Sequence, residues 1–160
     1  MKVYKKLIFN VVTCEKGVPV EIRAWQESDR PFLRTLYLRA RRENWRWLNG
    51  DRWQLEDFDA ETLGETLWVA MEEGNRVGFA SVLTSDNFLH CLFVDPDAQG
   101  RGVGSALLKH VQQQFTGTGA LKCLAKNRRA LAFYERHGWK PQARGESVQG
   151  EYVLMHYRLP

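Results

Sequence analysis

The chain has 160 residues, of which 44% are hydrophobic and 26% are charged, and its formal net charge is +4. This length suits one domain with a sizeable core, and the composition is ordinary for a soluble globular protein. It excludes a membrane-spanning helix, which needs about 20 consecutive apolar residues, and the N-terminus lacks the features of a cleaved signal. We therefore expect a single domain over residues 1–160, a cytoplasmic location and no membrane partner.

The first part of the chain predicts strands followed by a helix. Residues 1–19 form an N-terminal extension, in which residues 7–12 are a candidate added strand and residues 15–17 a turn. Residues 20–23 predict the next strand. A helix follows, with Ser28 or Asp29 as its cap and Pro31 in its first turn.

The segment after this helix is rich in aromatic and acidic residues. Three tryptophans fall within nine residues, which is unusual for an irregular segment that covers nothing: Trp45, Trp47 and Trp53. The stretch 51–73 contains eight acidic residues and only one basic residue. Such runs are most often solvated faces, and tryptophans can simply pin a loop to the core. The functional alternative is that the segment draws a cationic amine into a cleft.

The preceding helix has the opposite charge, because arginines crowd residues 34–46. Nucleic-acid binding through this face is a weaker alternative, which would need a steep salt dependence. We expect no nucleic-acid partner.

The second half alternates strands with helices. Residues 67–71 and 77–83 predict a hairpin, and residues 88–94 predict a strand that Pro96 ends. A helix from residue 103, a strand at 121–124, a helix after Asn127 and a final strand at 152–159 follow.

Residues 99–105, Gln-Gly-Arg-Gly-Val-Gly-Ser, are the most informative segment. They join a predicted buried strand to a helix, so unpaired N–H groups and the helix dipole create an anion site. Glycines let the backbone approach a phosphate closely. The glycine spacing does not match a P-loop or a dinucleotide fingerprint.

The glycine segment instead resembles the acetyl-CoA pyrophosphate loop of the GNAT superfamily of N-acetyltransferases, Q/R-x-x-G-x-G/A. Residues 127–139, NRRALAFYERHGW, resemble a second motif of that superfamily, N-x-x-A-x-x-F-Y-x-x-x-G-[FW]. The second motif also makes physical sense, because Asn127 is a good helix cap and Gly138 can end the helix. Two motifs in the correct order are far more specific than either motif alone.

The resemblance implies an α+β fold of the GNAT type. Its mixed, mostly antiparallel central sheet would be splayed between residues 89–94 and 121–124, with helices on both faces. Acetyl-CoA would enter that opening as the acetyl donor. The implied cofactor-binding residues are Leu92, Phe93, Val94, Gln99, Gly100, Arg101, Gly102, Val103, Gly104, Ser105, Asn127 and Tyr134. Basic side chains near the loop, Arg101, Lys126, Arg128 and Arg129, could neutralise the phosphates of CoA.

Two residues are the predicted catalytic pair. Tyr134 matches the general acid of the superfamily, and a phenol is protonated at neutral pH. The general base is less clear, because Phe88 occupies the position where many members carry a glutamate. His90 shares a strand face with Phe88 if no bulge intervenes, and a histidine titrates near neutrality. A buried structural role for His90 and a base role for Glu56 or Asp57 remain open.

The sequence thus predicts acetyl transfer to a primary amine by direct attack in a ternary complex. We expect the acceptor to be a small molecule that is bound by the aromatic and acidic segment, through Trp45, Trp47, Trp53, Glu56 and Asp57. The alternatives are a protein N-terminus or lysine as acceptor, and a non-catalytic acyl-CoA sensor. A homodimer is left open. We expect no metal and no disulfide, because the four histidines and three cysteines are scattered.

Overall fold

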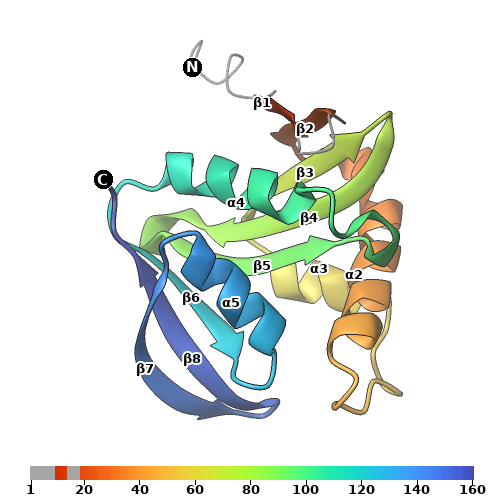
Figure 1. The fold of residues 1–160 in the computed structure, drawn as a ribbon. Helices are drawn as coiled ribbons and strands as arrows, with labels where there is room; N and C mark the ends of the chain where they lie inside the picture. The colour runs from red at the N-terminus through yellow and green to blue at the C-terminus, as the bar shows by residue number, and fades with distance from the viewer. Residues whose placement is uncertain (1–9, 14–18) are drawn as a thin grey trace.

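The computed structural model describes residues 10–13 and 19–160 (Figure 1). The strands are β1 (Asn10–Thr13), β2 (Pro19–Ala24), β3 (Thr66–Glu72), β4 (Asn75–Leu83), β5 (Phe88–Val94), β6 (Gly119–Leu124), β7 (Lys140–Ser147) and β8 (Gly150–Tyr157). The helices are α2 (Arg30–Asn44), α3 (Asp57–Thr62), α4 (Val103–Gln114) and α5 (Arg128–Arg136). Short 3-10 turns are η1 (Glu27–Asp29), η2 (Thr84–Asp86) and η3 (Pro96–Ala98).

The strands form one sheet in the order β1-β2-β3-β4-β5-β6-β8-β7. Neighbouring strands are antiparallel except β5 and β6, which run parallel. The predicted mixed, mostly antiparallel sheet is therefore confirmed. The added strand lies at Asn10–Thr13 and pairs with β2. Residues 7–9 and the predicted turn at 15–17 lie outside the described residues.

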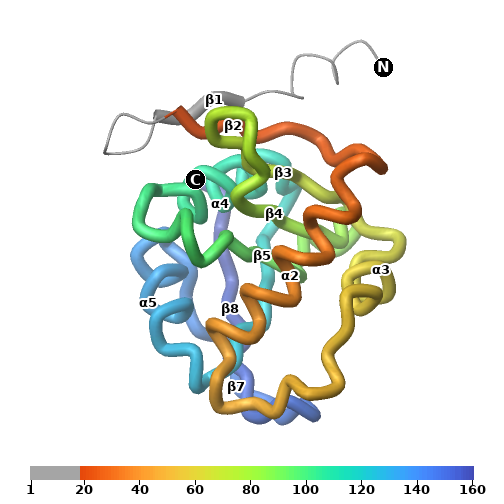
Figure 2. Tube along the Cα trace, turned by 90° about the vertical axis from the view of Figure 1, so that its right-hand side faces the viewer, coloured from red at the N-terminus to blue at the C-terminus, as the bar shows by residue number. Residues whose placement is uncertain are grey.

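Helices cover both faces of the sheet, as expected (Figure 2). On one face, α4 buries Leu107, Leu108 and Val111 in a core that also includes Trp139, and α5 packs against the same core. On the other face, α2 and α3 form a second core with the strands. The two cores lie on opposite faces of the sheet, because successive side chains of each strand point to alternate faces.

Asp29 anchors the start of α2, although its carboxylate does not cap the helix. The side chain is fully buried and accepts hydrogen bonds from Arg23 at 2.7 and 2.9 Å and from Arg76 at 2.6 Å. Burial alone would raise the pKa of Asp29. The hydrogen bonds from both arginines and from the Gln26 amide outweigh it and hold that pKa well below its usual range. The carboxylate thereby ties the N-terminus of α2 to β2 and β4.

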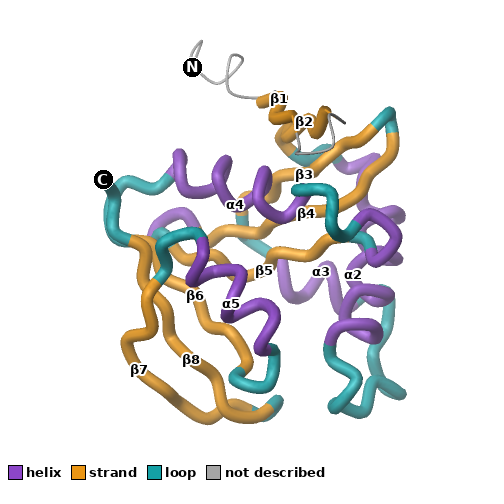
Figure 3. Tube along the Cα trace, viewed as in Figure 1, coloured by secondary structure: helices purple, strands orange, loops and turns teal. Residues whose placement is uncertain are grey.

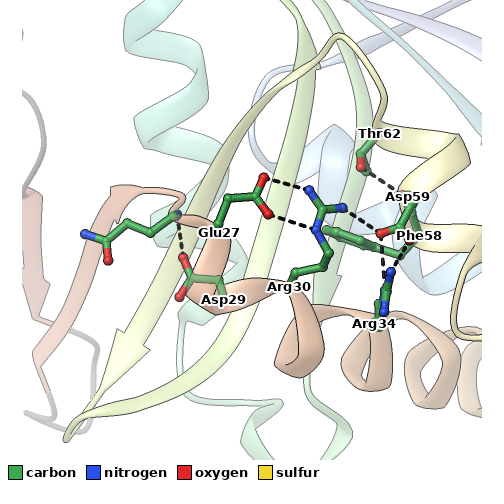
Figure 4. Close-up of polar contacts among 8 residues, drawn as sticks. Glu27, Asp29, Arg30, Arg34, Phe58, Asp59 and Thr62 are labelled. Carbon is green, nitrogen blue, oxygen red and sulfur yellow. Dashed lines mark hydrogen bonds and ion pairs between the residues drawn. The ribbon is translucent and has the colours of Figure 1, made fainter.

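Ion pairs fix α3 against α2 (Figure 4). Asp59 of α3 lies 2.6 Å from Nη1 of Arg30 and also pairs with Arg34. Arg30 in turn pairs with Glu27. These contacts pair two of the five arginines of α2 with acidic side chains.

The strand β7 was not predicted from the sequence. Among the strands that the structure describes, it pairs only with β8, and its residues are exposed or half-buried. Its sequence, KPQARGES, has no apolar alternation and contains Pro141, so nothing local marks it as a strand. Among the residues that the structure describes, no helix is long and apolar enough to cross a membrane.

Candidate functional site

The parallel strands β5 and β6 separate and leave a cavity between them. They are in register only at Phe88↔Ala120 and Leu89↔Leu121, although both strands continue for several residues (Figure 1). The predicted splay is thus present. A cavity of about 1060 Å³ extends through it and is lined by both strands, by α4 and by α5.

A bulge in β5 lies at the start of this separation. Leu89 is opposite Val82 and Cys91 is opposite Ser81, so His90 is the extra residue with no partner on β4. The alternation that would place His90 on the face of Phe88 therefore does not apply. Bulges bend a strand and redirect a side chain, and both effects are useful next to a site. Phe88 and His90 both line the cavity, with ring centroids 6.5 Å apart.

The glycine loop forms one wall of the cavity, and all seven residues from Gln99 to Ser105 line it. Gly100 and Gly102 have φ values of 80° and 83°, which side chains rarely tolerate. Gly102 is the N-cap of α4, so the amides of the first helical turn have no partner within the helix. This is the geometry of an anion site.

Gly104 lies where α4, β5 and α5 converge. A Cβ atom at this position would be 3.5 Å from Phe133 and 3.6 Å from Val94, both of which line the cavity. Leu92 and Phe93 line the same wall. The absence of a side chain at Gly104 therefore keeps this part of the cavity open.

The side chain of Arg101 lines the cavity but is already paired. Its guanidinium lies 2.5 Å from Oε1 of Glu72 and donates to the carbonyl of Asp97 at 2.9 Å. This side chain was expected from the sequence to help neutralise the phosphates, and in the structure two of its five N–H donors are already engaged.

Helix α5 supplies the opposite wall. The side chain of Asn127 accepts a hydrogen bond from the Ala130 amide at 3.3 Å, so the predicted cap is present. Tyr134 lines the cavity and packs against the core. Burial raises the pKa of Tyr134 well above its usual range, and the nearby Cys123 and Cys91 thiols add to this effect. The phenol therefore keeps its proton at every physiological pH.

Both described cysteines line the cavity as neutral thiols. Burial raises the pKa of Cys123 to about 12 and raises that of Cys91 further. A thiolate nucleophile is thus disfavoured at both positions.

His90 is surrounded by acidic side chains that sequence reasoning did not single out. Its Nδ1 lies 2.9 Å from Oε2 of Glu65, and its Nε2 lies 3.4 Å from Oε2 of Glu61. The hydroxyl of Ser81, which is fully buried, also donates to Glu65. Glu61 and Glu65 belong to the acidic stretch noted in the sequence. Nothing in that stretch distinguishes them from its other acids.

The tryptophan-rich segment is only partly in the cavity. Trp45 lines it and packs edge-on against Phe93, with centroids 5.8 Å apart. Trp47 lines a separate hollow beside Lys126 and Arg128. Figure 3 shows this segment as the long loop between α2 and α3, at the same end of the molecule as the β7–β8 turn. Residues 146–149 of that turn also line the cavity.

Trp53, Glu56 and Asp57 do not line the cavity, so the structure does not place them where an acceptor was expected to touch them. Two of them instead hold Arg41, whose buried guanidinium lies 4.9 Å from the Trp53 ring centroid and 3.2 Å from Asp57. Arg41 does line the cavity. Among the described residues, no group of three His, Cys, Asp or Glu side chains is arranged to hold a metal ion.

Comparisons with known proteins agree with this geometry. A family model described as an acetyltransferase (GNAT) domain matches residues 64–141. The peptidyl-lysine N-acetyltransferase YiaC of Escherichia coli (strain K12) is 32% identical over 123 residues, which are 74% of this chain and 82% of that protein.

Solved structures share the fold. The solution structure of apo-form YjaB from Escherichia coli matches with a TM-score of 0.73 and 27% identity, over 86% of this chain and 97% of that chain. The crystal structure of the PaiA N-acetyltransferase from Thermoplasma acidophilum was solved in complex with coenzyme A. It matches with a TM-score of 0.71 and 15% identity, over 88% of this chain and 99% of that chain. Together with the sequence motifs, these findings show that the chain belongs to the GNAT superfamily of N-acetyltransferases, enzymes for which acetyl-CoA is the co-substrate.

Proposed function

We propose that this protein transfers acetyl from acetyl-CoA directly to a primary amine when both are bound in the cavity between β5 and β6. The observation that carries the proposal is the composition of this single cavity. A glycine-rich helix start and a protonated phenol lie in the same space as a histidine held by carboxylates. Direct transfer needs a site that holds the thioester, a group that accepts the proton of the amine and a group that protonates the leaving thiolate.

The donor lies along β5 and against the glycine loop. The amides at the start of α4 bind the pyrophosphate, since helix N-termini attract anions. Beyond Leu89, the edge of β5 that faces β6 is no longer paired, so the backbone of residues 92–94 is available to the pantetheine arm. The Val94 amide is our candidate for stabilising the developing oxyanion. Asn127 both caps α5 and faces this arm.

Proton transfer is divided between the two walls. Tyr134 donates a proton to the departing thiolate, and burial keeps the phenol protonated for that role. His90 accepts the proton of the attacking amine, directly or through water. Cys91 takes no covalent part, because burial disfavours its thiolate. A sensor without turnover would need no such proton donor, which argues against that alternative.

The acceptor that we propose first is the side-chain amine of a lysine in a peptide or protein. The E. coli relative YiaC is named a peptidyl-lysine N-acetyltransferase. Trp45 of the tryptophan-rich loop and residues 146–149 of the β7–β8 turn also line the cavity, so the path of a polypeptide acceptor would run between these two segments, which lie at the same end of the molecule (Figure 3). Glu61 beside His90 favours a cationic amine at the end of this path.

A small-molecule amine, the acceptor expected from the sequence, is the second candidate. The observation that favours it is the aromatic end of the cavity, where Trp45, Tyr37 and Phe93 could enclose a compact ligand. An acceptor screen separates the two. Purified protein is given acetyl-CoA and one acceptor at a time, and the free thiol of CoA is measured.

The panel contains a peptide with one lysine and a blocked N-terminus, a lysine-free peptide with a free N-terminus, and small polyamines and aromatic amines. We expect the lysine peptide to give the highest kcat/KM. Preference for a small amine would support the second candidate. A protein that binds CoA but acetylates nothing in the panel would contradict the proposed transferase activity toward primary amines.

A further inference from the structure

The glycine loop is attached to the sheet by one arginine. Arg101 lies between Gly100 and Gly102, both of which have positive φ values. Its guanidinium bridges two partners outside its own turn, the carboxylate of Glu72 at 2.5 Å and the backbone carbonyl of Asp97 at 2.9 Å. One limb of the guanidinium therefore reaches the end of β3 and the other reaches η3, a forked contact that a lysine could not reproduce.

Glu72 is an unusual partner, because only 6% of its side chain is exposed. Its Oε1 binds Arg101, and within the described part of the chain its Oε2 is buried without a hydrogen-bond partner. A buried carboxylate is costly unless it is paired. The Glu72 carboxylate therefore favours a guanidinium beside its Oε1, and Arg101 supplies one while 42% of its own side chain stays exposed.

A second contact holds η3, the turn that leads into the glycine loop. Arg39 of α2 lies 3.3 Å from Asp95 and 3.2 Å from Asp97. These groups are more exposed than Glu72, so this pair is the weaker restraint. The two contacts limit the motion of a segment whose glycines would otherwise leave it with high conformational entropy.

We infer that Glu72 is a positioning residue for the donor site: through Arg101 it holds the glycine loop in the conformation whose backbone amides bind the pyrophosphate. Arg101 then serves as the link between loop and sheet and is not the cation that neutralises the phosphates. The inference rests on the proposed placement of CoA at this loop and extends it to the side chain of Arg101 and to Glu72, which does not line the cavity.

The opposite role for Arg101 makes an opposite prediction. If Arg101 were a phosphate ligand, Glu72 would compete with the phosphate for it. Removal of the Glu72 charge would then free the guanidinium and tighten CoA binding. If Arg101 is the link, the same change loosens the loop and weakens CoA binding.

The test is calorimetric titration of coenzyme A into the wild type, Glu72→Gln, Arg101→Gln and the double variant. We expect Kd to rise about 5- to 20-fold in Glu72→Gln, as for the loss of a charge-assisted hydrogen bond. The double variant should bind no more weakly than Arg101→Gln alone, because both changes break one contact. Glu73→Gln is the matched control, since it removes an equal charge from the adjacent, exposed residue and should leave Kd unchanged within twofold.

Unchanged or tighter binding of CoA by Glu72→Gln would overturn the inference. If that variant does not fold, Arg101→Gln carries the test through its salt dependence. If Arg101 binds a phosphate directly, the loss of CoA affinity in Arg101→Gln should become smaller as the salt concentration rises, because salt screens that contact. If Arg101 orders the loop, the loss of affinity should persist at high salt. Failure of the wild type to bind CoA at all would instead contradict the proposed donor site, so the two failures are distinguishable.

Discussion

The Nδ1 atom of His90 lies 3.0 Å from Oε1 and 2.9 Å from Oε2 of Glu65, at the point where β5 and β6 separate. Glu65 is nearly buried and also accepts a hydrogen bond from the Ser81 hydroxyl. An ionised carboxylate at Nδ1 favours the tautomer that carries its proton there, which leaves Nε2 free to accept a proton. Nε2 lies 3.4 Å from Oε2 of Glu61.

Replacement of Glu65 by glutamine should therefore impair catalysis more than binding. We expect kcat to fall by about 10- to 100-fold, because the ring loses its fixed orientation and charge support. KM for acetyl-CoA should stay within about twofold. The measurement is steady-state kinetics with the best acceptor from the screen.

Glu56→Gln is the control for this change, since Glu56 belongs to the same acidic stretch but lies outside the cavity lining. It should behave as wild type. In His90→Gln, kcat should fall by at least as much as in Glu65→Gln. Full activity in His90→Gln would return this residue to a structural role.

Gly104→Leu should weaken CoA binding without unfolding the protein. Leucine suits a helix, and Gly104 does not need a positive φ, whereas substitution at Gly102 would strain the backbone. The new side chain would enter the space beside Phe133 and Val94. We expect Kd for CoA to rise more than about 10-fold, equivalent to about 1.4 kcal/mol.

Calorimetry gives the affinity of Gly104→Leu, and thermal unfolding checks its fold. Gly104→Ala adds one methyl group at ordinary contact distance and serves as the graded control. Normal CoA affinity in a folded leucine variant would place the donor elsewhere.

Two residues of the tryptophan-rich loop, Trp45 and Trp47, should respond differently to the class of acceptor. Trp45 lines the cavity, and Trp47 lies outside it in the neighbouring hollow. Trp45→Ala should raise KM for every acceptor by about 5-fold or more, through lost aromatic packing. Trp47→Ala should raise KM for a lysine peptide and leave KM for a small amine unchanged. Equal effects of Trp47→Ala on both classes would contradict this division.

The features that the sequence predicted well are those encoded by neighbouring residues. Asn127 and Gly138 mark the two ends of α5, and in the structure Asn127 caps the helix and Gly138 has a φ of 89°. The glycine loop is equally local. Beyond it, the strand at 121–124, the helix after Asn127 and the final strand were also predicted, whereas β7 was not.

The features that the sequence could not predict depend on distant contacts. The bulge at His90 arises from pairing between β4 and β5, and the two glutamates reach the ring from a different segment. Arg101 has the charge of a phosphate ligand, but only the fold shows that Glu72 is beside it. Trp53 and Asp57 were expected at the acceptor, whereas they pack against and pair with Arg41. The composition of a segment does not show whether its aromatic and acidic side chains hold another residue, as these two hold Arg41, or contact a substrate.

His110 should make the protein less stable in mild acid. Its side chain is fully buried in α4, 4.3 Å from the Trp68 ring centroid, and burial lowers its pKa to about 4. In the unfolded chain a histidine titrates near 6.5, so between about pH 6.5 and pH 4 the unfolded state binds a proton that the folded state does not. Stability must then decrease as the pH falls through that range.

The expected loss from His110 is about 2 kcal/mol between pH 7.5 and pH 5. Urea unfolding at these two pH values measures it, and His110→Gln, which does not titrate, is the comparison. Asp29 does not interfere, because its low pKa keeps it ionised throughout the range. An equal loss of stability in the wild type and in His110→Gln would contradict the assignment.

Tyr134 offers the most direct test of the chemical step. Tyr134→Phe removes one oxygen and keeps the ring, so its packing against Phe133 and Trp139 should persist. If the phenol protonates the departing thiolate, kcat should fall by about 10²- to 10⁴-fold, or about 3–5 kcal/mol of barrier, while the affinity for CoA changes little. Because burial holds the pKa of Tyr134 far above its usual range, the wild type should show no loss of activity near pH 10 from this group. A fall of less than about threefold in the folded variant would mean that water or another donor supplies the proton. In that case Tyr134 would belong to the core and not to the reaction.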